Sequence, residues 1–174
     1  MEIKDCLLTD ADEILTLYDA ASELQRKHKV VEWPKFQKSF IEAEIIENRQ
    51  FKIMHNDLIA CNWAVTYDDK EIWGEMDKND SIFIHRICTN PNLRGNRYID
   101  QIVAWAKIYA KNKGKQFVRL DTLGNNTSLI KHYTSAGFNF LGIFILTDTA
   151  NLPGHYQKES NCCLFEIDLR VADE

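Results

Sequence analysis

The 174-residue sequence contains no hydrophobic run long enough to span a bilayer, and no apolar segment of the kind found in signal peptides follows its first residues. It also has no excess of positive charge: 26 acidic residues outnumber 21 lysines and arginines, which gives a net charge of -5. Nucleic acids and anionic membranes favour basic surfaces, so we expect neither as a partner. These absences predict a cytoplasmic protein.

The sequence lacks the cysteine pattern of a disulfide framework, because its five cysteines are odd in number and irregularly spaced. Neither the cysteines nor the five histidines show the spacing of metal ligands, so no metal is expected. This cysteine usage suits a reducing compartment. A Walker-type Gly-x-x-x-x-Gly-Lys-Ser/Thr run is also missing, which argues against a nucleotide-binding domain.

The composition, with 45% hydrophobic and 27% charged residues, is that of an ordinary globular protein. Residues 1–174 are expected to form a single domain, since no linker or repeat interrupts them. The predicted elements indicate an α/β fold with a mixed, largely antiparallel sheet flanked by helices, and one right-handed parallel crossover. Strands are predicted at 2–7, 51–55, 58–66, 83–89, 117–122, 138–146 and 162–169, and helices after Asp10, from Pro34, from about 97 to 112 and after Asn126.

Two short patterns in the second half of the chain carry most of the functional information. The turn Arg94-Gly95-Asn96-Arg97 opens a helix, and backbone N–H groups at a helix N-terminus hold phosphates. Asn126 and Tyr133 are seven residues apart, so they share one helix face at a separation of roughly 10 Å. Together these patterns suggest an enzyme that binds a long phosphorylated cofactor.

The segment from residue 83 to residue 142 resembles the core of the GCN5-related N-acetyltransferases. In that family a strand and a proline precede Gln/Arg-x-x-Gly-x-Gly/Ala, whose backbone N–H groups hold the pyrophosphate of coenzyme A. Arg94 matches the first position of this motif, whereas Arg97 and Ile99 stand where small residues are usual. The later family pattern is met by Asn126, Tyr133, Gly137 and Phe138.

The resemblance implies an N-acetyltransferase that moves an acetyl group from acetyl-CoA directly to a primary amine of a small molecule or peptide. The alternative is a catalytically silent acyl-CoA-binding or regulatory module of the same fold. Coenzyme A would contact the strand through Ile87, Cys88 and Thr89 and the second helix through Asn126. The predicted contacts at the turn and the start of its helix are Arg94, Gly95, Asn96, Arg97, Tyr98 and Ile99.

Three residues are candidates for proton transfer. By resemblance, Tyr133 is the acid that protonates the departing thiolate, although it also fits a core position. Asp121 is a base acting through water, or a cap of the turn that follows it. A histidine such as His85 titrates in the right range for proton transfer, but His85 also fits the alternative of a strand histidine with satisfied hydrogen bonds. Asn126 fits a helix N-cap as well as a cofactor contact.

The remaining expectations concern partners. Cys88 has no adjacent base in the sequence, which disfavours a covalent acetyl relay. Exposed edge strands are compatible with a homodimer. Six acidic residues crowd the loop before the cofactor strand, where they form either a solvated loop or the border of an acceptor site for cationic amines: Asp68, Asp69, Glu71, Glu75, Asp77 and Asp80.

Overall fold

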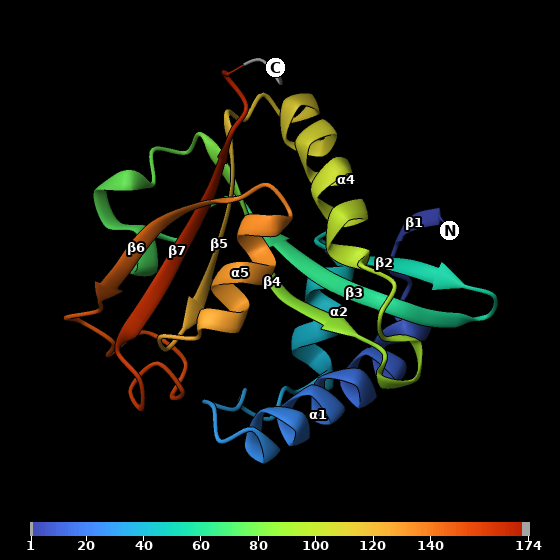
Figure 1. Ribbon diagram of the computed structural model, residues 1–174. Helices are drawn as coiled ribbons and strands as arrows, with labels where there is room; N and C mark the ends of the chain where they lie inside the picture. Colours follow the sequence, from blue (N-terminus) through green and yellow to red (C-terminus); the bar gives the residue numbers. More distant parts are fainter. Residues whose placement is uncertain (1, 172–174) are drawn as a thin grey trace. The chain divides into compact units, whose positions relative to one another are not determined.

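The computed structural model describes residues 2–171, which form an α/β fold with a seven-stranded sheet (Figure 1). The strand order is β1-β2-β3-β4-β5-β7-β6. The pairs β1–β2, β2–β3, β5–β7 and β6–β7 are antiparallel and β4–β5 is parallel, which confirms the predicted sheet. The strands are β1 (Glu2–Asp5), β2 (Gln50–His55), β3 (Leu58–Thr66), β4 (Ser81–Thr89), β5 (Phe117–Leu123), β6 (Asn139–Ile145) and β7 (Asn161–Asp168).

The helices agree with the prediction except in two places. The helix expected from Pro34 begins at Lys38, because Gln37 has an extended backbone and is the N-cap. The stretch expected as a loop before β4 contains a short α-helix followed by a 3₁₀ turn at Gly74–Met76. Across residues 2–171, every helix is too short or too polar to cross a membrane. The helices are α1 (Ala11–Lys27), α2 (Lys38–Ile46), α3 (Lys70–Trp73), α4 (Tyr98–Asn112) and α5 (Thr127–Ser135).

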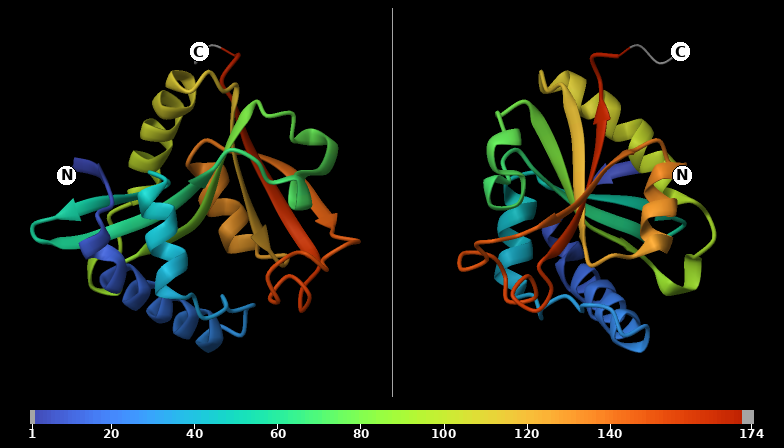
Figure 2. Two further views of the ribbon diagram at one scale, coloured as in Figure 1. Left: turned by 180° about the vertical axis from the view of Figure 1, so that it is seen from behind. Right: turned by 60° about the vertical axis from the view of Figure 1, so that its left-hand side comes forward.

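The chain divides into two compact units. Within the described residues, the first unit comprises 2–65 and 85–98, and the second comprises 66–84 and 99–171. In the first unit, α1 and α2 pack against the strands β1, β2 and β3 (Figure 2). Its core holds fully buried side chains from both helices and from β3, including Ile14, Ile41 and Ile59.

In the second unit, α5 packs on β6 and β7 through aromatic rings. The ring of Tyr133 lies 5.3 Å from that of Phe165, which in turn lies 5.3 Å from Phe140. A second cluster includes Trp73, Phe83 and Leu164. The apolar stripe predicted for α4 is confirmed, since four of its members are buried: Ile99, Ile102, Val103 and Ala106.

Candidate active site

The turn before α4 contains two residues with left-handed backbone conformations. Gly95 and Arg97 both have positive φ angles, of 90° and 44°. Asn96 closes the turn from inside, because its Nδ2 donates to Leu93 O (2.9 Å) and to Tyr98 Oη (3.2 Å). The first N–H groups of a helix have no intrahelical acceptors, and the helix dipole favours negative charge there. The binding of a phosphate at this turn stays a prediction, with which the backbone conformation is compatible.

Arg97 occupies a conformation that glycine adopts without steric cost. Its φ of 44° lies in the left-handed region, where a Cβ crowds the following carbonyl. The sequence shows arginine at the position where the family motif has glycine, and the structure shows that the backbone nevertheless keeps the shape that glycine permits. The exposed side chain places a cation at the start of α4.

Replacing Arg97 with glycine should therefore stabilise the fold. The left-handed conformation costs about 1 to 2 kcal/mol for an ordinary residue, and the flexibility of glycine in the unfolded chain offsets part of the gain, so we expect about 0.5 to 1 kcal/mol. Urea unfolding of Arg97→Gly and Arg97→Ala measures this, because both variants lose the side chain but only glycine relieves the strain. Equal stability of the two variants would contradict the assignment of strain.

Strand β4 contains a backbone irregularity at Arg86, which sequence patterns did not reveal. Its parallel ladder with β5 comprises three pairs, from Ser81↔Phe117 to Phe83↔Arg119, and the strand then continues to Thr89. Arg86 has a φ of 52°, which costs on the order of 1 to 3 kcal/mol unless the surroundings hold it. A left-handed residue inside a strand re-aims the residues that follow it.

Contacts within the first unit hold Arg86 in place. Its Nη2 donates to both carboxylate oxygens of Glu44 (2.6 and 2.7 Å), which is itself buried. Its guanidinium also lies over three aromatic rings, at 5.2 Å from Phe40, 5.5 Å from Phe36 and 6.0 Å from Tyr18. The buried ion pair and the rings together fix the course of β4 just before Ile87, Cys88 and Thr89.

Cys88 is a structural thiol. Its Sγ donates to Leu17 O (3.2 Å), and it is 2% exposed. Burial raises the pKa of this thiol to about 12, so it stays protonated at neutral pH. The nucleophile in thiol chemistry is the thiolate, so Cys88 is unsuited to carrying an acetyl group. This geometry supports the expectation that no covalent relay operates.

Asn126 is the N-cap of α5, as the sequence suggested. Its Oδ1 accepts from the backbone N–H of Ser128 (3.1 Å) and of Leu129 (3.2 Å). The capping role is confirmed, and it fixes the side chain rigidly at the start of the helix. A contact of Asn126 with a cofactor stays a prediction, and such a contact would use the amide nitrogen, since the oxygen already accepts two hydrogen bonds.

Tyr133 lies half-buried on the last turns of α5. Its ring is 5.3 Å from Phe165 and 6.0 Å from Phe138, so it packs on these rings. Gly137, with a φ of 101°, ends the helix and lets the chain bring Phe138 back to the tyrosine. The spacing of the tyrosine and the Gly-Phe pair is thus explained locally by the end of the helix and the packing of the two rings. The rings would hold the phenol in one orientation.

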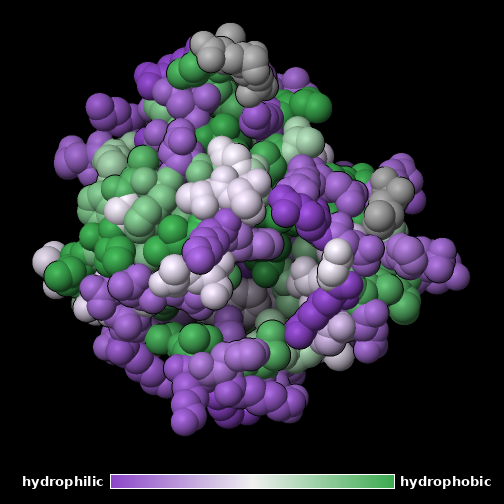
Figure 3. All heavy atoms as spheres, viewed as in Figure 1, coloured by the Kyte–Doolittle hydropathy of each residue, from purple (hydrophilic) through white to green (hydrophobic). Residues whose placement is uncertain are grey.

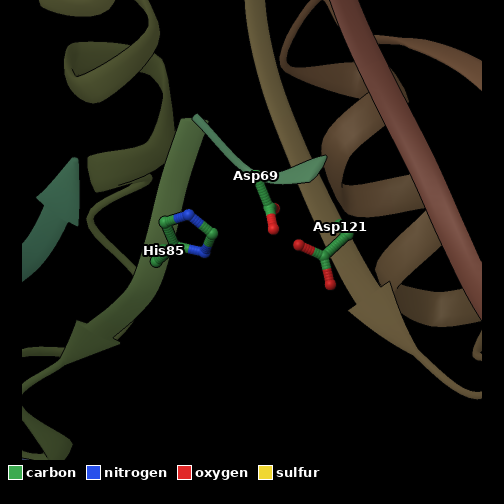
Figure 4. Close-up of side chains that lie close together, drawn as sticks. All are labelled: Asp69, His85 and Asp121. Carbon is green, nitrogen blue, oxygen red and sulfur yellow. The ribbon is translucent and has the colours of Figure 1, made fainter. Parts of the chain in front are cut away.

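Asp121, on β5, has a carboxylate neighbour, Asp69, which the sequence placed only in the acidic segment before β4. One carboxylate oxygen of Asp121 lies within 4.8 Å of one from Asp69, and Figure 4 shows the two groups pointing toward each other. Asp121 Oδ2 also accepts from Tyr156 Oη (3.3 Å) and from Cys162 Sγ (3.6 Å). Neither partner could be found from the sequence, because both come from distant segments of the chain.

Burial raises the pKa of both carboxyl groups. The pKa of Asp69 is raised by burial first and then by the charge of Asp121, whereas burial acts on Asp121 against the hydrogen bonds of Cys162 and Tyr156, which lower its pKa. Two nearby carboxylates are hard to ionise together, so one of them takes up a proton more readily than an exposed acid does. Such a pair is suited to accepting a proton near neutral pH.

The other predicted base, His85, has the opposite character. Burial lowers its pKa to about 3, with further contributions from Arg86 and Arg49. A general base works best when its pKa lies near the operating pH. His85 is therefore neutral at pH 7 and a poor proton acceptor, which agrees with the alternative of a strand histidine.

The acidic segment before β4 is more ordered than a solvated loop. Asp77 is buried and accepts hydrogen bonds from the backbone N–H of Asp69 (2.7 Å) and of Asn79 (3.1 Å). It therefore acts as a structural cap of the segment that contains α3. Only some of the six acidic residues remain exposed: Asp68, Glu71 and Glu75.

Comparison with known proteins identifies the class of protein. The profile of the Acetyltransferase (GNAT) family matches residues 15–138, so the chain belongs to this family of acetyl-CoA-dependent acyltransferases. The uncharacterized N-acetyltransferase YesJ of Bacillus subtilis (strain 168) is 26% identical over 74 residues. That alignment covers 42% of this chain and 41% of the relative, which is less than half of its length.

Solved structures share the fold at low identity. A GNAT-family acetyltransferase from Listeria monocytogenes 4b F2365 superposes with a TM-score of 0.75 at 18% identity, covering 96% of this chain and 94% of that one. The yncA protein of Salmonella typhimurium, solved with its cofactor acetyl-CoA, gives a TM-score of 0.71 at 13% identity, with 100% and 96% coverage. These likenesses establish the fold.

Proposed function

We propose that this protein transfers an acetyl group from acetyl-CoA directly to a primary amine of a small molecule or peptide. Residues 1–174 would act as one N-acetyltransferase domain in the cytoplasm, without a metal. The observation that carries the proposal is the turn at residues 94–97 that opens α4, because its two left-handed residues and the N–H groups at the helix start would suit an anion. Membership of the GNAT family supplies the reaction class.

The residues at the turn fit a pyrophosphate. Arg94 and Arg97 are both exposed and add two cations to the helix N-terminus. Ile99, which departs from the family motif, is 4% exposed, so its side chain belongs to the core. Gly95 and Asn96 would contribute backbone N–H groups, and Tyr98 is held by its hydrogen bond from Asn96.

The reaction needs three groups of the protein: a hydrogen-bond donor, a base and an acid. A hydrogen-bond donor has to face the thioester carbonyl oxygen as it gains charge, and backbone N–H groups at Ile87 to Thr89 would supply it. A base has to take a proton from the amine, and the raised pKa of Asp121 suits it better than His85. An acid has to protonate the sulfur, and the phenol of Tyr133 is protonated at neutral pH.

Acetyl-CoA is expected to bind more tightly than acetyl-pantetheine, which lacks the phosphates. Arg94→Ala should weaken acetyl-CoA binding by about 1 to 3 kcal/mol, the range for a hydrogen bond to a charged group, and leave acetyl-pantetheine unaffected. Isothermal titration calorimetry measures the affinity for both ligands. Arg170→Ala is the matched control, since that arginine is similarly exposed but pairs with Asp168. No detectable heat at millimolar acetyl-CoA would overturn the proposal.

Turnover separates the enzyme from a silent module of the same fold. Release of free thiol from acetyl-CoA should depend on an added amine, tested across polyamines, aminoglycosides, amino acids and peptides. Exposed acidic residues near α3 favour cationic acceptors, whose kcat/KM would fall with rising ionic strength. Tight acetyl-CoA binding without turnover for any amine would support the silent alternative.

A further inference from the structure

Strand β6 is an edge of the sheet with an unusually apolar surface. It pairs with β7 on one side, and among residues 2–171 no strand pairs with its other side. Its large side chains are exposed on both faces of the strand, and Figure 3 shows hydrophobic residues gathered over β6 at the left of the view. The exposed fractions are 37% for Phe140, 38% for Leu141, 42% for Ile143, 40% for Phe144 and 70% for Ile145.

This edge lacks the features that keep sheet edges apart in monomeric proteins. Such edges usually carry lysines, other charges or proline, since an open edge is a template for another strand. From Asn139 to Ile145 the sequence contains neither a charged residue nor a proline. An uncharged, strand-forming segment of seven residues that stays open to solvent favours association.

The sequence of β6 is close to symmetric about Gly142. It reads Phe-Leu-Gly-Ile-Phe, so an antiparallel second copy presents side chains of the same size at each position. Dimers with two-fold symmetry use one patch on both subunits, which requires such self-complementarity. We propose that β6 is the interface with a second copy of this chain, arranged antiparallel about a two-fold axis near Gly142.

In this arrangement Phe140 lies beside the partner's Phe144, and Leu141 lies beside the partner's Ile143. Gly142 sits at the axis, where the absence of a side chain lets two backbones approach closely. Its φ of 121° is accessible to glycine, and the ladder with β7 shifts register between Phe140 and Gly142. Because a bulge interrupts regular strand pairing, side-chain packing rather than a long ladder would dominate the contact.

The exposed area predicts a dimer of modest affinity. Five apolar side chains of this size, each roughly half exposed, offer on the order of 400 Å² per copy. A standard interface buries about 800 Å² per partner, so backbone and flanking residues have to supply the remainder. The dimer is therefore expected to dissociate on dilution.

Sedimentation velocity over a concentration series from nanomolar to high micromolar tests the proposal. The wild-type chain should shift from monomer to dimer, and Ile143→Lys or Ile145→Lys should raise the dissociation constant at least 100-fold, because each puts two lysines into the apolar contact. Ile108→Lys is the control, since Ile108 on α4 is 63% exposed but lies outside β6. Circular dichroism checks that each variant is folded.

Two outcomes would overturn the interface: a wild-type chain that is monomeric at every concentration, or a dimer that survives both lysine variants. If Ile143→Lys fails to fold, Ile145→Lys decides the question. Cysteine cross-linking then tests the axis, because all five native cysteines are buried. A mixture of Leu141→Cys and Ile143→Cys should yield more disulfide-linked dimer than either variant alone, and equal yields would refute the axis at Gly142.

Discussion

Replacing Tyr133 with phenylalanine is expected to lower kcat by about 10²- to 10⁴-fold, the usual contribution of a general acid. The phenylalanine ring keeps the contacts with Phe165 and Phe138, so α5 should stay in place and only the hydroxyl is lost. Acetyl-CoA affinity should change little, because the proposed role is confined to the departing thiolate. Steady-state kinetics and calorimetry on the same preparation measure the two quantities separately.

Two controls make the Tyr133 result interpretable. Phe138→Leu disturbs the same aromatic cluster without touching a hydroxyl, so it should lower the melting temperature more than kcat. A leaving thiol of lower pKa should need less protonation, and an acetyl thioester of such a thiol should therefore recover much of the rate lost in Tyr133→Phe. An unchanged kcat, where chemistry is shown to limit the rate, would make Tyr133 a packing residue.

Replacing Asp121 with asparagine is expected to lower kcat/KM at pH 7 by a similar factor, about 10²- to 10⁴-fold, if this carboxylate is the base. The loss should shrink as the pH approaches the pKa of the amine, near 10 for an alkyl amine, because the free amine needs no base. A pH–rate profile distinguishes this result from damage to the fold. His85→Gln, which changes the other candidate for the general base, should lower kcat/KM less than tenfold.

The stability of Asp121→Asn provides an independent check. Because burial raises the pKa of Asp121, the folded chain binds its proton more tightly than the unfolded chain does. The stability from this proton is present below the ordinary carboxyl pKa of about 4 and is lost as the pH rises through the raised pKa. The asparagine variant does not titrate there, so its melting temperature relative to wild type should rise between pH 4 and pH 8. A constant difference would show that the carboxyl pKa is not raised.

Local patterns explain why much of the fold could be predicted. The stripe that begins at Ile99 repeats with the period of a helix, and α4 ends at Asn112 as expected. Asn126 and Gly137 are a capping residue and a helix-ending glycine, and each acts within a few residues of its own position. The parallel pairing of β4 and β5 also follows from local information, since a helix separates two strands.

What the sequence alone determined is the order of the elements, the family and the turn that opens α4, because these depend on neighbours along the chain. Only the tertiary structure decided that Arg86 takes a left-handed conformation, since its contacts with Glu44 and three aromatic rings hold it there, and only the structure revealed the positive φ of Arg97. It alone brought Asp69 next to Asp121, because their segments are 52 residues apart in sequence and meet by folding. Burial then gave both carboxyl groups raised pKa values, a property that follows from loss of solvent and not from residue type.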